Sequence, residues 1–167
     1  MKIAILGSGG REHAIAYAIS KSKKIEKIFC LPGNAGTDII AENIIIDINN
    51  FEQVYNFLKK EKINFVIVGP EQPLVDGIVD YLEKFNIKVF GPNKMSSQLE
   101  GSKIFTKNLC KKYNIPTADF GTFKTKEDTF KFLKKANHPI VIKADNLASG
   151  KGVYICKNLD ESTNAVE

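Results

Sequence analysis

Residues 3–14 have the sequence IAILGSGGREHA, which predicts a buried strand, a glycine turn and the start of a helix. Such a junction gathers free backbone N–H groups and the positive end of a helix dipole, and both favour an anionic ligand. The dinucleotide fingerprint needs glycines at positions 7, 9 and 12, but position 12 is Glu12. An NAD site also needs an acid after the next strand, which here is followed by Pro32-Gly33. Both departures favour a different phosphorylated ligand.

The composition is that of an ordinary globular protein, with 43% hydrophobic and 26% charged residues among 167. This length allows one domain, or one domain and part of a second. Apolar runs are too short to cross a membrane and Met1-Lys2 leads directly into a strand, so we expect no signal peptide and no membrane partner. Three widely separated cysteines without metal-ligand spacing indicate reduced thiols, and we expect a cytoplasmic protein.

The net charge of +5 arises in the second part of the chain. Residues 1–100 hold twelve Lys+Arg and twelve Asp+Glu, whereas residues 101–167 hold twelve Lys and seven Asp+Glu. This excess fits a polyphosphate partner, although solvated helix faces also explain pairs such as Lys111-Lys112. Because no basic run is interleaved with aromatic residues, we expect no nucleic-acid partner. Arg11 is the only arginine, which points to a need for its planar guanidinium.

The pattern of residues 2–92 alternates strands and helices, which predicts an α/β fold with a Rossmann-like parallel sheet covered on both faces. The expected elements, after the first strand, are strands at 27–31, 44–46, 65–68 and 88–90 and helices at 11–20, 51–61 and 74–85. Ligands of such sheets bind beyond the carboxyl ends of the strands. The candidates at that edge are Gly9, Gly10, Asn34, Gly36 and Glu71.

Structural explanations compete with a binding role for three of the polar residues at this edge. Glu71 can simply complement the dipole of the helix that follows it. Asn34 lies in the turn sequence PGNAG, where turn chemistry alone explains it. His13 can cap or pack its helix, and the sequence offers it no Ser or Cys partner arranged for nucleophilic catalysis.

The pattern changes after Pro92. We expect a mostly helical segment over 93–113, a strand at 120–123, a helix at 126–135, and strands at 139–145 and 153–156 around a glycine loop. This Gly-Lys-Gly opens a strand rather than a helix, so it is not a P-loop. The loop can still fold over nucleotide phosphates, with Lys143 partly buried, or it is a hairpin with solubilising lysines. Asp160 is expected to cap a last helix that is cut short.

Five motifs follow one another along the chain: GSGGREHA at 7–14, PGNAGT at 32–37, GPEQPL at 69–74, LEGSK at 99–103 and IKADNLASGKG at 142–152. Together they resemble the phosphoribosylamine–glycine ligases, the glycinamide ribonucleotide synthetases of de novo purine (IMP) biosynthesis. The resemblance implies a pre-ATP-grasp substrate-binding domain over 1–100 and the beginning of an incomplete ATP-grasp domain over 101–167. The implied reaction joins glycine to 5-phosphoribosylamine and yields glycinamide ribonucleotide, ADP and phosphate.

The same resemblance assigns roles to residues. ATP would be bound by Lys103, Lys143, Ser149, Gly150, Lys151 and Gly152. Phosphoribosylamine would be bound by Gly9, Gly10, Arg11, Asn34 and Glu71, with Glu71 on the ribose hydroxyls. The family usually has glycine and alanine where Asn146 and Ser149 stand here.

The partners implied are the small molecules ATP, glycine and phosphoribosylamine, with Mg or Mn as a further cofactor. The metal ligands are expected beyond residue 167, no certain catalytic residue is expected within the chain, and the chain is expected to be inactive alone. The alternatives are a Rossmann-type NAD-dependent oxidoreductase and a non-enzymatic nucleotide-binding module. The sequence is compatible with more than one group as the binder of the substrate phosphate.

Overall fold

The computed structural model describes residues 1–147 and 151–167, which form two compact units, Met1–Gln98 and Leu99–Glu167. The residues Ser149 and Gly150, expected to bind ATP, lie outside the described residues. Among the helices of the described ranges, none has both the length and the apolar character needed to span a membrane.

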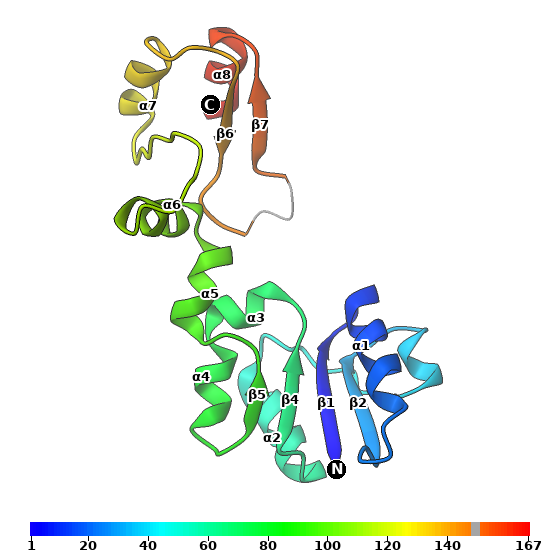
Figure 1. Cartoon of the computed structure of the whole chain (residues 1–167). Coiled ribbons are helices and arrows are strands. Elements are labelled where there is room, and N and C mark those ends of the chain that lie inside the picture. Colours follow the sequence, from blue (N-terminus) through cyan, green and yellow to red (C-terminus); the bar gives the residue numbers. More distant parts are fainter. Residues whose placement is uncertain (148–150) are drawn as a thin grey trace. The chain divides into compact units, whose positions relative to one another are not determined.

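The first unit is built on a five-stranded sheet in the order β3-β2-β1-β4-β5. All four neighbouring pairs are parallel, as the arrows of Figure 1 show for the central strands. The order reverses between β1 and β4, which makes the gap beyond their carboxyl ends the topological switch point. The strands are β1 (Lys2–Gly7), β2 (Lys27–Pro32), β3 (Glu42–Asn43), β4 (Phe65–Val68) and β5 (Lys88–Phe90). The α/β class predicted from the sequence is confirmed.

Helices cover both faces of this sheet. Side chains of successive strand residues point to opposite sides, so the apolar strands present apolar side chains on both faces. Ile3 and Ile5 of β1 pack with Ala16 of α1 (Gly10–Ser20) on one face. Ala4 and Leu6 pack on the other face, in the cluster that includes buried residues of α2 (Phe51–Glu61) and α4 (Ile78–Glu83). The remaining helices of this unit are η1 (Thr37–Ile39) and α3 (Glu71–Asp76).

Two elements of this unit differ from the sequence-based expectation. The third strand, expected at 44–46, is found at Glu42–Asn43, and Ile44 and Ile46 pack against the core from irregular chain. The single helix expected at 74–85 is two helices, α3 and α4, because Gly77 between them has φ +101°. A left-handed glycine ends a helix readily, and the apolar periodicity that runs through it gives no sign of the break.

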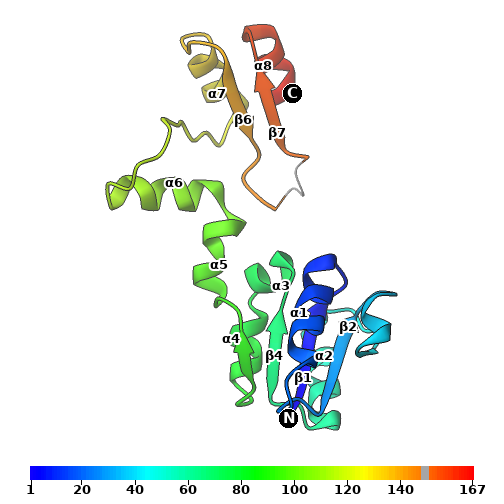
Figure 2. The same cartoon turned by 45° about the vertical axis from the view of Figure 1, so that its right-hand side comes forward.

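The second unit contains an antiparallel hairpin of β6 (Ile140–Lys143) and β7 (Val153–Cys156). The last helix, α8 (Leu159–Val166), packs on this hairpin, and α7 (Lys126–Leu133) contacts α8 (Figure 2). Before them come α6 (Lys103–Lys112) and α5 (Lys94–Gly101), which crosses the boundary between the units.

Three expectations for the second unit are wrong. Residues 120–123 form no strand, and Phe123 instead packs on Phe132 with ring centroids 4.9 Å apart. The cap of α8 is Asn158, whose side chain accepts from the Glu161 N–H at 2.9 Å, rather than Asp160. Lys143 is exposed rather than partly buried. It alternates with Ile142, which is less exposed, so it points to the other face of the hairpin.

Leu58→Ala is expected to lower the free energy of unfolding by about 2–5 kcal/mol, since the Leu58 side chain is fully buried against the sheet and its loss leaves a cavity. Urea denaturation followed by circular dichroism measures this change. Ile45→Ala is the matched control, because Ile45 is 87% exposed and its truncation removes few contacts. Equal effects of the two substitutions would contradict the assigned core.

Candidate functional site

The glycine turn after β1 lies at the switch point, where the chain passes from strand to helix. Gly7, the last residue of β1, is buried and has φ +124°, a conformation that residues with a side chain rarely adopt. Gly9 is the N-cap of α1 and has extended backbone, and the helix begins at Gly10. The turn therefore aims the N-terminal end of α1 at the carboxyl edge of the sheet, as the sequence predicts.

The side chain of Glu12 lies under this turn, and the residue is only 3% exposed. Its Oε2 accepts the Gly9 N–H at 2.6 Å, and its Oε1 pairs with Arg11 Nε at 3.1 Å. A Cβ placed on Gly7 or Gly9 would come within 2.7 and 2.8 Å of the Glu12 side chain, and one on Gly69 would overlap it. Three glycines thus form a cradle that only the Glu12 carboxylate fills.

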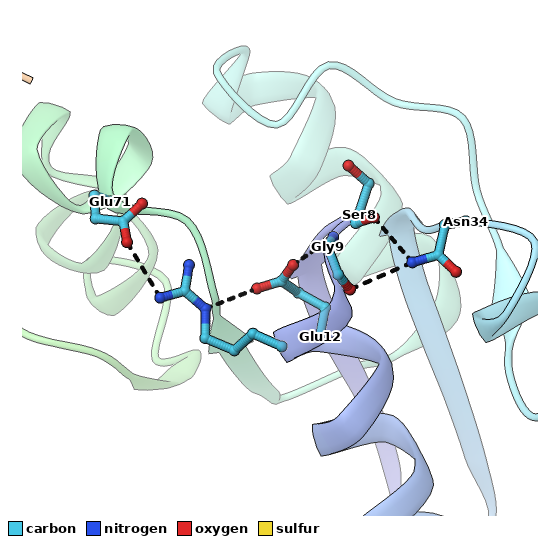
Figure 3. A network of polar contacts seen from close by, with 6 residues as sticks. Ser8, Gly9, Glu12, Asn34 and Glu71 are labelled. Atoms are coloured by element: carbon cyan, nitrogen blue, oxygen red, sulfur yellow. Dashed lines mark hydrogen bonds and ion pairs between the residues drawn. The ribbon is translucent and has the colours of Figure 1, made fainter. Parts of the chain in front are cut away.

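Arg11 extends this contact across the switch point to α3. Its Nη1 donates to Glu71 Oε1 at 3.2 Å, so the guanidinium lies between two carboxylates (Figure 3). Hydrogen bonds to Glu12 and then to Glu71 raise the pKa of Arg11. The pKa of Glu71 is lowered, first by its own backbone N–H at the start of α3 and then by Arg11. Glu71 therefore begins a helix, as its structural explanation requires, and it also pairs with Arg11 beside the glycine turn.

Asn34 ties the loop after β2 to the same turn. Its Nδ2 donates to the carbonyl oxygens of Ser8 at 2.9 Å and Gly9 at 3.3 Å (Figure 3). Its Oδ1 accepts the N–H groups of Gly36 at 2.7 Å and Thr37 at 3.0 Å. Turn chemistry and attachment to the glycine turn are therefore both present at this one side chain.

The structure brings together most of the residues expected to bind the substrate. Gly9, Arg11, Asn34 and Glu71 belong to one continuous set of contacts, and Gly10 lies at the start of α1 with open space where a Cβ would point. The partly buried ring of His13 lies beside Gly36, where a Cβ would come within 3.1 Å of it.

Glu12 is the residue that the sequence analysis missed, because it was treated only as an absent glycine. Its signal was present, since an acid three residues after the helix N-cap is the second half of a capping box.

The residues expected to bind ATP are in the second unit, around the loop end of the hairpin. Lys103 Nζ donates to the carbonyl oxygen of Asn146 at 2.8 Å. Lys143 ends β6, and the next residue, Ala144, donates its N–H to the Gly152 carbonyl at 2.8 Å. Lys151 precedes Gly152 and is exposed. Of the six expected residues, the four that are described thus adjoin one loop.

Asp145 is a second residue that the sequence analysis did not single out. Its carboxylate accepts the Ser102 hydroxyl at 3.1 Å and the Ile104 N–H at 2.9 Å. Ser102 in turn caps α6 by accepting the Phe105 N–H at 3.0 Å. The strand end and the start of α6 are therefore held together, and this contact places Lys103 beside the loop. Within residues 1–147 and 151–167, no group of three or more His, Cys, Asp and Glu is placed to hold a metal ion.

Comparison with known protein families shows which class of protein this chain belongs to. Residues 101–167 match the family model described as phosphoribosylglycinamide synthetase, ATP-grasp (A) domain, which places this part of the chain among ATP-grasp folds. Residues 1–100 match the model described as phosphoribosylglycinamide synthetase, N domain. The chain belongs to the phosphoribosylglycinamide synthetase family, so the resemblance found in its sequence is confirmed.

Named relatives agree with this assignment. The chain is 48% identical to the phosphoribosylamine–glycine ligase of Clostridium acetobutylicum over 95% of its length, and 46% identical to that of Caldanaerobacter subterraneus subsp. tengcongensis over all of it. It spans 38% and 40% of those two relatives. The crystal structure of phosphoribosylamine–glycine ligase from Thermotoga maritima superposes with a TM-score of 0.79 at 37% identity, covering 98% of this chain and 38% of that one.

Gly69→Ala is expected to destabilise the first unit by about 1–3 kcal/mol, because the new methyl group forces the Glu12 carboxylate away from Gly9 and Arg11. Urea denaturation measures the loss. Gly10→Ala is the matched control, since nothing lies within 4 Å of its Cβ position. If both variants were as stable as the parent, the glycine cradle would not constrain Glu12.

Glu71 is expected to titrate below its ordinary pKa of 4.5. Because its pKa is lowered in the folded chain, its stabilising contribution is present above pH 4.5 and is lost as the pH falls through the lowered value. Carbon-13 NMR of the Glu71 carboxyl group measures this pKa. Arg11→Ala should raise it only part of the way, since the backbone N–H remains, and Lys21→Ala should leave it unchanged. A value of 4.5 or above in the parent chain would contradict the arrangement.

Proposed function

We propose that this chain supplies the substrate-binding part and the first nucleotide-binding part of an ATP-dependent ligase that joins glycine to 5-phosphoribosylamine. The products are glycinamide ribonucleotide, ADP and phosphate, as in purine biosynthesis. In this proposal residues 1–100 form the substrate-binding domain and residues 101–167 begin the ATP-grasp domain. Family membership and the names of the relatives support this reaction.

The observation that carries the proposal is the polar network of Glu12, Arg11 and Glu71 at the β1/β4 switch point. This is where open parallel sheets bind ligands. The network offers charged groups and hydrogen-bonding atoms to a small polar molecule. Glu12 stands where the dinucleotide fingerprint has its third glycine, and its carboxylate accepts the Gly9 N–H. We assign Gly9, Gly10, Arg11, Asn34 and Glu71 to the phosphoribosylamine pocket, with the exposed Glu71 accepting hydrogen bonds from ribose hydroxyls.

For ATP we assign Lys103, Lys143, Ser149, Gly150, Lys151 and Gly152 to the phosphate-binding end of the hairpin. Several lysine ammonium groups near one loop suit the negative charge that accumulates during phosphoryl transfer. In the proposed sequence a carboxylate oxygen of glycine attacks the γ-phosphorus of ATP and ADP leaves. The amine of phosphoribosylamine then attacks the acyl carbon and phosphate leaves.

ATP-grasp membership also implies Mg²⁺ or Mn²⁺, which would neutralise phosphate charge. The described residues form no cluster suited to such an ion, and we place its ligands in the part of the relatives that this chain does not span.

A chimera tests the reaction. This chain replaces the matching 40% of the Caldanaerobacter relative, and the product is expressed in a bacterial strain that lacks phosphoribosylamine–glycine ligase. Growth without added purines is expected, whereas the 167-residue chain alone should not restore growth. A folded and soluble chimera that gave neither growth nor ATP-dependent glycinamide ribonucleotide formation in vitro would overturn the proposal.

Lys143→Ala in this chimera is expected to lower kcat/KM for ATP by about a hundredfold, because one cation that we assign to the transferring phosphoryl group is removed. Steady-state kinetics with varied ATP measures the change. Lys134→Ala, which removes an exposed lysine after α7, is the control and should leave the kinetics unchanged. Unaltered kinetics in Lys143→Ala would remove Lys143 from the site.

A further inference from the structure

Glu12 is a buried charge placed where a ligand's charge would be expected. In a strand–glycine turn–helix junction, the backbone N–H groups at the helix N-terminus normally hold an anionic group of the ligand. Here the N–H of the N-cap, Gly9, donates to the chain's own Glu12 carboxylate at 2.6 Å. The residue is 3% exposed, so this contact is screened little by water.

The glycine cradle keeps the carboxylate in this position. Side chains at Gly7, Gly9 and Gly69 would each collide with Glu12, so the contact is specified by residues of β1, of the turn and of the chain just after β4. Ionised groups are costly to bury unless they are paired and hydrogen-bonded. Arg11 Nε, 3.1 Å from Oε1, and the Gly9 N–H supply the partners.

The charged side chains of this network therefore carry a net negative charge. Two carboxylates, Glu12 and Glu71, share one guanidinium, that of Arg11. Glu12 also lies in the first turn of α1, where a negative charge offsets the helix dipole. A phosphate approaching the N–H of Gly10, the first residue of α1, would meet a like charge.

We propose that Glu12 determines which end of the substrate this site accepts. Its carboxylate stands in for the phosphate at the N-terminus of α1, so that the turn receives the amine and ribose end of phosphoribosylamine and rejects the phosphate end. The identity of the substrate rests on the proposed function, whereas the exclusion of phosphate follows from the contacts of Glu12 alone.

A titration with inorganic phosphate tests the exclusion in the 167-residue chain itself. The amide signals of Gly9 and Gly10 are followed by nitrogen-15 NMR in the parent, in Glu12→Gln and in Glu12→Gly. Glu12→Gln keeps the shape of the side chain and removes its charge, and Glu12→Gly also empties the cradle and frees the Gly9 N–H. Phosphate is expected to bind about tenfold more tightly to Glu12→Gly than to the parent, with Glu12→Gln between them.

Glu26→Gln is the matched control, because it changes the net charge equally at an exposed position before β2. It should bind phosphate as weakly as the parent. Saturable binding by the parent as tight as by Glu12→Gly, or an equal gain in Glu26→Gln, would overturn the proposal. If Glu12→Gly does not fold, the phosphate titration of Glu12→Gln tests the proposal instead. A phosphate affinity of Glu12→Gln no higher than that of the parent would then contradict it.

A second measurement separates this role from a merely structural one. In the chimera, Glu12→Gln is expected to raise KM for phosphoribosylamine severalfold and to leave KM for ATP unchanged. A folding defect would instead lower the reaction rate whether phosphoribosylamine or ATP is the varied substrate. An equal change in both constants would contradict the assignment. Failure of the parent chimera to make glycinamide ribonucleotide would overturn the proposed function. The phosphate titration would still test the exclusion of phosphate by Glu12, because it does not depend on ligase activity.

Discussion

The buried contact between the Glu12 carboxylate and the Gly9 N–H is the constraint around which the first unit's site is arranged. A charged group at this depth must be matched in shape and in hydrogen bonds, or burial would cost several kcal/mol. Glycines at positions 7, 9 and 69 provide the shape, and Arg11 provides the opposite charge. Each of these residues is therefore explained by the same carboxylate, although they come from separate segments of the chain.

The sheet topology turns this local contact into a site. Parallel strands β1, β2 and β4 end at the same edge, so the loops that follow them meet there. Asn34 attaches the loop after β2 to the turn after β1, and the Arg11–Glu71 ion pair attaches the start of α3 to the same turn. The ion pair is exposed and contributes little to stability by itself, so its value lies in where it holds two charged groups.

In the second unit, too, a carboxylate accepts a backbone N–H at the start of a helix, and here it belongs to Asp145. Asp145 accepts hydrogen bonds from Ser102 and from the Ile104 N–H, and thereby fixes the start of α6 beside the hairpin. Lys103 then reaches the Asn146 carbonyl. In both units a carboxylate bonded to backbone N–H groups at a helix N-terminus positions a neighbouring cation.

The sequence by itself determined the parallel α/β sheet, the hairpin around a glycine loop and the edge where Gly9, Arg11, Asn34 and Glu71 gather. Apolar runs and turn residues are local signals, and parallel strand ends must share an edge. Only the tertiary structure decided the place of the third strand, the break at Gly77 and the packing of Phe123, because these depend on backbone conformation and on distant partners. The role of Glu12 belongs to the same group. Its cradle needs Gly69, which is 57 positions away along the chain, and only folding brings the two together.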